Sequence, residues 1–208
     1  WKFLSDAALR RHLGEFRDRF RRRSHDAEAC LPDALAAIRE AAERTTSLRP
    51  FTVQLMGALV LHRGCLAEMA TGEGKTLTAS LVAVLAGWTG RPCHIVTVND
   101  YLAQRDARRL QPLYAFCGVS VGCVTGIMPP EDRMRGYAQD VTYTTSKEVV
   151  ADFLRDRLRL AERHHPARRL LHRHIDPHRA PDGLVMRGLH TAIIDEADSV
   201  LIDEAVTP

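Results

Sequence analysis

Hydrophobic residues in the first fifty positions recur at helical spacing. One predicted helix, which Ser5 can cap, has its apolar side chains four, three and four residues apart, at Leu9, Leu13, Phe16 and Phe20. Pro32 suits the first turn of a second helix, whose apolar face carries Leu35, Ile38 and Ala42. A third helix is expected after Pro50. The pattern therefore predicts an N-terminal helical segment over residues 1–50.

After Gly64 the pattern changes to short apolar runs that alternate with helical segments. The expected strands are Cys65–Met69, "PCHIVTV" (92–98), "VSVGCVT" (119–125), "DVTYTT" (140–145) and "LHTAIIDEA" (189–197). The expected helices between them are Lys75–Ala86, "DYLAQRDARRL" (100–110) and Ser146–Leu160. Strands separated by helices predict an α/β fold with a parallel sheet covered on both faces.

Composition excludes several classes of protein. The 208 residues are 45% hydrophobic and 26% charged, as in an ordinary globular protein, and the net charge of +3 does not by itself imply nucleic acid. The five cysteines form no Cys-x-x-Cys pair, which argues against a disulfide framework or a zinc ribbon and favours reduced thiols in the cytosol. No signal peptide is expected in Trp1–Leu13, and Leu77–Trp88 is too short an apolar run to span a bilayer.

A glycine-rich turn lies between the first expected strand and the helix that follows it. Its sequence, Thr71-Gly72-Glu73-Gly74-Lys75-Thr76, is typical of a phosphate-binding loop, although Met69 stands where the strict pattern has its first glycine. In such a loop backbone N–H groups surround the anion, and the helix N-terminus adds partial positive charge. Lys75 would reach the β- and γ-phosphates and Thr76 would coordinate Mg²⁺.

An acidic pair follows the last expected strand. Asp195 and Glu196 come directly after the apolar residues Ala192–Ile194, at the sheet edge where α/β proteins bind ligands. Asp195 would hold Mg²⁺, through water, and Glu196 would position or deprotonate an attacking water. The alternative for this pair is a solvated acidic strand end, and the alternative for the loop is a plain strand–helix turn.

Longer segments resemble the SecA family of preprotein translocase motor ATPases, in order along nearly the whole chain. They are "FTVQLMGALVLHRGCLAEMATGEGKTL" (51–77), "VTVNDYLAQRDA" (96–107), "VTYTTSKEVVADFLRD" (141–156) and "RGLHTAIIDEADSVLIDEAVTP" (187–208). RNA helicases of superfamily 2 carry a P-T-R-E-L type string at the place of the second segment, and this chain has none. The resemblance implies that residues 51–208 form an incomplete first nucleotide-binding domain of the RecA-like, P-loop NTPase type.

Site residues follow from the resemblance position by position. Gln54 matches the family's adenine-recognising glutamine, whose amide can donate and accept hydrogen bonds at once. The nucleotide loop is matched by Gly72, Glu73, Gly74, Lys75 and Thr76, and the magnesium and water-activating pair by Asp195 and Glu196. Arg105 and Arg155 also lie in the matching segments, where an internal salt bridge is as reasonable as contact with a partner. The implied cofactors are ATP or ADP and Mg²⁺.

Several positions depart from the family pattern without removing a phosphate, magnesium or water-activating group. They are Thr52, Ala70, Ser146, Lys147, Ala197 and Val206. Together they suggest a divergent or accessory paralogue rather than a housekeeping motor.

Residues 158–186 match the family poorly and are expected to be a basic insertion rich in His and Arg. Its histidines are His164, His165, His172, His174 and His178. A metal site is conceivable there, although no cysteine or carboxylate cluster completes a ligand set. A cationic surface for an acidic phospholipid headgroup or an acidic partner is the better interpretation.

The resemblance also implies a motor cycle and its partners. ATP binding would close two nucleotide-binding domains and hydrolysis would reopen them, driving unfolded preproteins through the Sec translocon channel. The protein would be cytoplasmic and peripheral at the inner face of the bacterial plasma membrane, with a homodimer as an open alternative to a single copy. Because the arginines of the second domain are worth about 10³–10⁵ in rate, we expect this chain by itself to bind nucleotide weakly and to hydrolyse it very slowly.

Two other functions remain open at this point. A nucleic-acid helicase of the DEAD type would bind RNA tightly and in a salt-sensitive way. A non-catalytic interaction module would keep the fold and lose nucleotide-dependent stabilisation.

Overall fold

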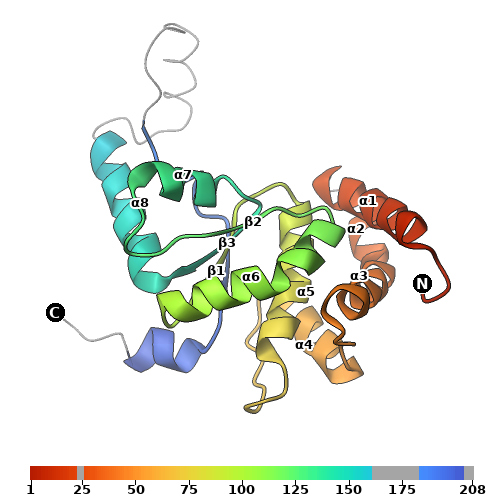
Figure 1. The fold of residues 1–208 in the computed structure, drawn as a ribbon. Helices are drawn as coiled ribbons and strands as arrows, with labels where there is room; N and C mark the ends of the chain where they lie inside the picture. Colours follow the sequence, from red (N-terminus) through yellow and green to blue (C-terminus); the bar gives the residue numbers. More distant parts are fainter. Residues whose placement is uncertain (23–25, 161–182, 204–208) are drawn as a thin grey trace, which may run out of the picture.

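Four parallel strands form one sheet at the centre of the computed structural model, which describes residues 1–22, 26–160 and 183–203 (Figure 1). The strands are β1 (Cys93–Thr97), β2 (Val121–Cys123), β3 (Val141–Thr145) and β4 (Thr191–Ile194). The helices are α1 (Asp6–Arg22), α2 (Asp26–Ala29), α3 (Leu31–Thr46), α4 (Thr52–His62), α5 (Lys75–Trp88), α6 (Asp100–Phe116), α7 (Pro130–Tyr137) and α8 (Ser146–Leu160), with the short π-helix η1 (Ser199–Asp203) after β4.

The strand order is β2-β3-β1-β4, so the chain leaves β1 toward one edge of the sheet and returns on its other side. β1 pairs with β3 from Cys93↔Val141 onward and with β4 from Cys93↔Thr191 onward. The reversal of direction beside β1 creates a switch point at the carboxyl ends of β1 and β4. Ligands of open α/β sheets bind at such a point.

Alternating side chains of the strands face two different helical layers. Ile95 of β1 and Tyr143 of β3 belong to the main core with α5 and α6, and the Tyr143 hydroxyl is 2.8 Å from that of Tyr114 in α6. On the other face His94 packs against Tyr137 of α7, and the Thr142 hydroxyl donates to the carbonyl of Gly136. The prediction of an α/β fold with a parallel sheet covered on both faces is therefore confirmed.

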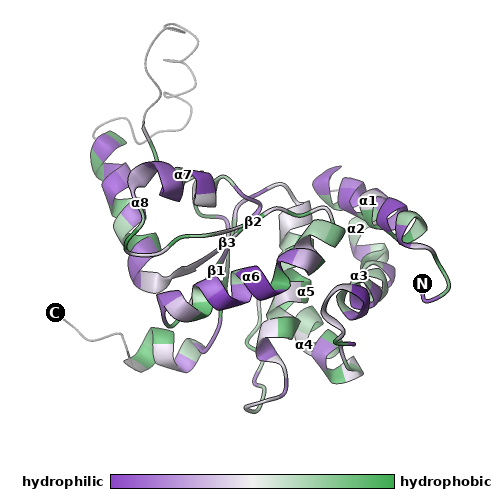
Figure 2. Cartoon of the chain, viewed as in Figure 1, coloured by the Kyte–Doolittle hydropathy of each residue, from purple (hydrophilic) through white to green (hydrophobic). Residues whose placement is uncertain are grey.

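The helix α5 is buried along most of its length. Ala, Val and Leu line nearly all of its sides, because it is covered by the sheet, by α4 and by the N-terminal helices (Figure 2). Its last residue, Trp88, is buried, packs on Phe20 of α1 and donates a 2.9 Å hydrogen bond to the carbonyl of Cys117. α5 therefore connects the glycine-rich turn at its start to the helical layer at its end.

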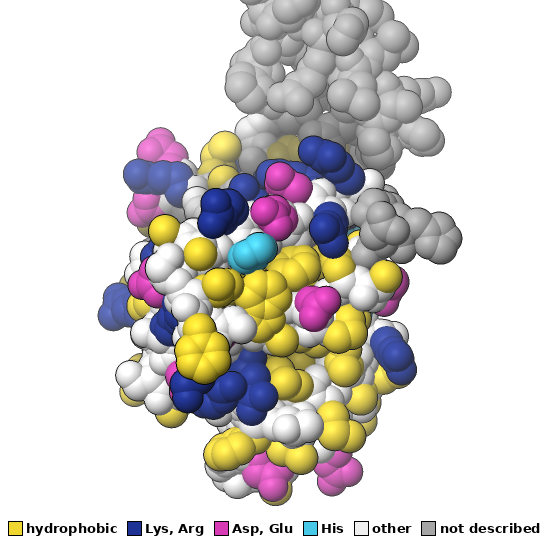
Figure 3. Space-filling view, turned by 90° about the vertical axis from the view of Figure 1, so that its right-hand side faces the viewer, with side chains coloured by type: hydrophobic (Ala, Val, Ile, Leu, Met, Phe, Trp, Pro, Cys, Tyr) yellow, Lys and Arg dark blue, Asp and Glu magenta, His cyan; other side chains and the backbone are white. Residues whose placement is uncertain are grey.

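The N-terminal helices pack on this core. The four apolar residues predicted for the first helix are all buried, and the Ser5 hydroxyl accepts from the Ala8 N–H at 3.3 Å, as expected of a cap. Buried Glu40 of α3 binds Arg44, which also pairs with Asp6 at 2.9 Å and so ties α1 to α3. Figure 3 shows this helical side of the molecule, where hydrophobic side chains gather at the centre and charged ones surround them.

The structure differs from the sequence-based prediction at one expected strand and at one helix that was not expected. Cys65–Met69 is not a strand, and most of its side chains are exposed. β4 is the edge strand next to β1, and no pairing joins Cys65–Met69 to it among the described residues. Conversely, α7 was not predicted, because its eight residues bury little except Arg133, Gly136 and Tyr137 and so lack an apolar stripe.

The other elements follow their predictions closely. α5 continues to Trp88, two residues beyond its expected end, α6 continues to Phe116, six residues beyond its expected end, and α8 has the expected bounds. The histidines of the expected insertion at 158–186 lie outside the described residues, as does Val206; residues 158–160 belong to α8. Within the part of the chain that the structure describes, no helix is both long and apolar enough to cross a membrane.

Candidate functional site

The glycine-rich turn leads directly into α5. Gly72 and Gly74 both have positive φ, 86° and 83°, which glycine adopts without strain. Gly74 is the N-cap residue and Lys75 the first residue of α5, so the free N–H groups and the positive end of the helix dipole lie at the turn. Lys75 and Thr76 are half-buried, and Gly72 and Glu73 are exposed. This local geometry suits an anion such as a phosphate group.

Gln54 is buried in α4 and holds the turn in place. Its amide nitrogen donates to the Glu73 carbonyl at 2.6 Å, and its oxygen accepts from the Phe51 N–H at 2.8 Å. A Cβ atom on Gly74 would lie 2.3 Å from the same amide nitrogen, so glycine is required there for space as well as for φ. The second N–H and the second lone pair of the amide are still available in principle to a base such as adenine.

The acidic pair lies at the carboxyl end of β4, as predicted. The Asp195 N–H donates to the Val96 carbonyl at 2.9 Å, which extends the pairing of β4 with β1 to the end of the strand. Glu196 then has φ 55°, a left-handed conformation that is uncommon for a residue with a long side chain. Strained residues of this kind cluster at functional sites, and the following residues form the π-helix η1, another feature that recurs there.

The groups that act electrostatically on Asp195 come from both the glycine-rich turn and the acidic pair. Burial raises the pKa of Asp195, the carboxylates of Glu196 and Asp106 raise it further, and the ammonium of Lys75 lowers it. Each of these groups must therefore lie within electrostatic reach of the Asp195 carboxyl. The Arg105 guanidinium also interacts with Asp195, so three carboxylates are set against two cations, and the remaining negative charge is what a divalent cation would stabilise.

A magnesium ion fits this arrangement best when it is shared with a nucleotide. Among the residues that the structure describes, no three His, Cys, Asp or Glu side chains are grouped to hold a metal ion. Mg²⁺ commonly keeps several waters and binds one or two carboxylates together with substrate phosphates. Thr76 and Asp195 are the residues that would hold it here.

Arg105 and Arg155 both form ion pairs within the domain. Arg105 donates from Nε and Nη2 to the Asp106 carboxylate at 2.8 and 3.2 Å, and Arg155 pairs with Asp152 at 2.8 Å. Asp106 itself was not predicted as part of the site. It lies in a helix, where the sequence pattern would predict a surface position for a single Asp. In the structure it is buried and contributes to the charge around Asp195.

Comparison with known proteins decides the family. A family model described as the SecA DEAD-like domain matches residues 1–208. The chain belongs to this SecA family. The match spans the helical segment and the sheet alike, so the resemblance noted from the four sequence segments is confirmed over the full chain.

Individual SecA relatives agree with this assignment. The chain is 53% identical over 205 residues to the protein translocase subunit SecA 2 of Chlorobium chlorochromatii and 49% identical to that of Magnetococcus marinus, with 99% of the chain covered in each case. It is 47% identical to the protein translocase subunit SecA of Rubrobacter xylanophilus. The chain spans 31%, 32% and 20% of the lengths of these three proteins.

Proposed function

We propose that this chain is the first nucleotide-binding part of an ATP-driven protein translocase. In this proposal ATP or ADP occupies the turn at the start of α5, with its phosphates at the Gly72–Thr76 backbone and Lys75. Gln54 reads adenine, while Thr76 and Asp195 hold Mg²⁺ and Glu196 positions the attacking water. The observation that carries the proposal is the position of the acidic pair at the carboxyl end of β4, at the switch point of the sheet, in a chain of the SecA family.

The proposed chemistry of the chain's own residues is mainly electrostatic. Lys75 and the N-terminal N–H groups of α5 would stabilise charge on the transferred phosphoryl group. Glu196 would hold water in line with it and accept a proton. The Mg²⁺ would neutralise charge shared by the β- and γ-phosphates.

The whole protein would couple this cycle to transport. Its proposed partners are unfolded preproteins and the Sec channel, and its proposed place is the cytoplasmic face of the plasma membrane, with acidic phospholipid as a possible contact. The names of the relatives, protein translocase subunits, support the transport role. They also favour it over a nucleic-acid helicase.

Thermal unfolding with and without Mg-ADP tests the proposal. A ligand that binds only the folded state stabilises it by about 2.7 kcal/mol at 100 times its Kd. For a chain of this size each kcal/mol raises Tm by about 2–4 °C. We expect a rise for the parent chain and none for Lys75→Ala.

Lys2→Ala is the matched control, because Lys2 is an exposed lysine distant in sequence from the turn. It should respond to Mg-ADP as the parent does. Absence of a rise in the parent would contradict the proposed site and favour a non-catalytic interaction module. Tight binding of RNA that weakens steeply with salt would instead favour a helicase.

A further inference from the structure

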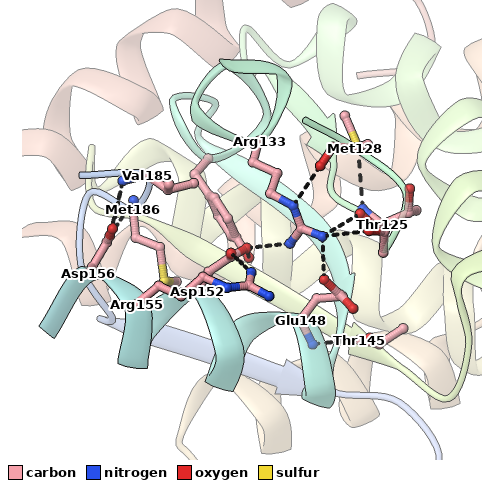
Figure 4. A network of polar contacts seen from close by, with 12 residues as sticks. Thr125, Met128, Arg133, Thr145, Glu148, Asp152, Arg155, Asp156, Val185 and Met186 are labelled. Carbon is pink, nitrogen blue, oxygen red and sulfur yellow. Dashed lines mark hydrogen bonds and ion pairs between the residues drawn. The ribbon is translucent and has the colours of Figure 1, made fainter. Parts of the chain in front are cut away.

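α8 carries two buried carboxylates one turn apart, and they hold different parts of the molecule (Figure 4). Asp152 pairs with Arg133 of α7 at 2.6 Å and accepts from the Tyr137 hydroxyl at 3.0 Å. Asp156 instead accepts from main-chain N–H groups of the segment that leads into β4. The function proposed above uses neither of them.

The contacts of Asp156 are short and sheltered from water. Its carboxylate accepts from the Val185 N–H at 2.9 and 3.1 Å and from the Met186 N–H at 2.8 Å. Asp156 is 6% exposed, and Val185 and Met186 are buried with Val124 and Tyr137 in a second small core. Hydrogen bonds to an ionised acceptor are about twice as strong as those between neutral groups.

Further contacts hold the chain between this anchor (the Asp156 carboxylate with the Val185 and Met186 N–H groups) and β4. Arg187 donates from Nε to the Tyr137 carbonyl at 3.0 Å, and the Thr191 N–H donates to the Pro92 carbonyl at 3.3 Å, where β4 begins to pair with β1. Nine positions after Met186 the chain reaches Asp195. The carboxylate of α8 therefore holds the start of the segment whose end carries the acidic pair.

β4 needs such an anchor because its own pairing is short. The strand has four residues, and Ile193 is buried whereas the side chains of Ala192 and Ile194 are exposed, so burial specifies its register through a single residue. A slip of one residue would move Asp195 by about 3.3 Å along β1 and turn its side chain to the other face. Either change would move the Asp195 carboxyl relative to Lys75, whose ammonium acts on it electrostatically.

We propose that Asp156 is a positioning residue for the nucleotide site. Its carboxylate sets the register of β4 on β1 and thereby places Asp195 and Glu196 at the carboxyl edge of the sheet. This inference rests on the proposed function of the acidic pair, but the anchor itself is a separate physical claim about residues 185–195.

The test uses the intact protein that carries this chain, with Asp156→Asn. An amide has one acceptor oxygen, so an NH₂ group that cannot accept takes the place of one carboxylate oxygen and faces a main-chain N–H. We expect hydrogen exchange of the amides in 185–195 to become at least about tenfold faster, while β3 stays protected. The gain in ADP affinity that Mg²⁺ provides should fall by about 10–100-fold, as for other groups that orient metal ligands.

Tyr137→Phe is the matched control. It removes one hydrogen bond to Asp152, in the same small core, and leaves the Asp156 anchor intact. It should lower Tm yet keep both the exchange rates of 185–195 and the Mg²⁺-dependent gain. ADP affinity without Mg²⁺ should be unchanged in both variants.

Two results would overturn the inference. One is Asp156→Asn with its Mg²⁺-dependent gain intact; the other is faster exchange spread evenly over the whole chain. If Asp156→Asn does not fold, Asp156→Glu is the deciding variant, because its extra methylene displaces the carboxylate. Faster exchange in 185–195 and a smaller Mg²⁺-dependent gain in ADP affinity would support the anchor. Unchanged exchange and an unchanged gain would refute it. If Mg²⁺ does not raise the ADP affinity of the parent protein, the proposed function is refuted. Hydrogen exchange of the amides in 185–195 still tests the anchor in that case.

Discussion

At the scale of single residues, Glu196 combines a proposed catalytic carboxylate with an unfavourable backbone conformation. Its φ of 55° lies in the left-handed region, where a residue with a Cβ costs about 1–2 kcal/mol. The next residues form a π-helix rather than a regular α-helix. The strain therefore falls on the residue whose carboxylate must be aimed most accurately.

Replacing Glu196 by Asn should separate stability from activity. Asparagine tolerates the left-handed region, so we expect the free energy of unfolding to rise by about 1 kcal/mol. ATP hydrolysis by the intact protein should be lost, because the amide cannot accept the proton. Urea unfolding and phosphate release measure the two effects.

Glu196→Ala is the control for this pair of effects. It removes the same carboxylate but keeps a residue that disfavours positive φ, so it should lose hydrolysis without gaining stability. If both variants gain the same stability, the charge of the Glu196 carboxylate, and not its backbone conformation, would be what destabilises the parent protein.

At the scale of elements, α7 and α8 are joined by a buried ion pair. The Arg133 guanidinium binds Asp152 and Glu148, each at 2.6 Å, and donates to the carbonyls of Thr125, Gly126 and Met128. It is 5% exposed, and Asp152 is 1% exposed. This one side chain therefore fixes the loop after β2, the helix α7 and the helix α8 relative to one another.

Arg133→Ala should be severely destabilising. Breaking a buried pair costs about 3–5 kcal/mol, and the contacts that Asp152 keeps, with the exposed Arg155 and the Tyr137 hydroxyl, replace the buried guanidinium only in part. Arg135→Ala in the same helix is the matched control, because its pair with Asp132 is exposed to solvent and should contribute less than about 1 kcal/mol. Denaturant midpoints of the two variants should differ clearly; equal midpoints would contradict the importance of the buried pair.

The elements also show how far sequence patterns reach. The amphipathic helices α1, α3, α6 and α8 were predictable because burial of one face imposes a helical period. The strands β1 and β3 are buried at every position and were predictable from their short runs of β-branched and aromatic residues. The conformation of Cys65–Met69 was not predictable in this way. A strand forms only when it pairs with a neighbouring strand, and that pairing depends on segments distant in the sequence. Likewise the loop and acidic pair were visible as local patterns, whereas the anchor at Asp156 depends on two N–H groups that follow it by about thirty residues.

At the scale of the whole molecule, the N-terminal helices share the core of the sheet domain. Leu13 of α1 is 1% exposed and belongs to the same buried cluster as Leu81 of α5 and Leu113 of α6. The proposed division at residue 50 therefore does not divide the packing of the core. Removal of either part would expose apolar surface of the other.

Leu13→Ala tests this shared core. A large-to-small change at a fully buried leucine costs about 2–5 kcal/mol. We expect one cooperative transition at a lower temperature, with far-UV circular dichroism and tryptophan fluorescence changing together. Leu158→Ala, at a position 80% exposed on α8, should leave the transition nearly unchanged. Two separate transitions in Leu13→Ala would instead indicate that α1–α3 unfold independently.

The position of Trp88 has a consequence for spectroscopy. The chain has two tryptophans, and both contact α1: the ring of Trp88 lies 5.7 Å from that of Phe20, and the ring of Trp1 lies 5.9 Å from that of Phe16. Intrinsic fluorescence therefore reports the docking of α1. Because Trp88 ends the helix that Lys75 begins, an emission change on adding nucleotide would show that binding at one end of α5 is felt by the helical layer at the other.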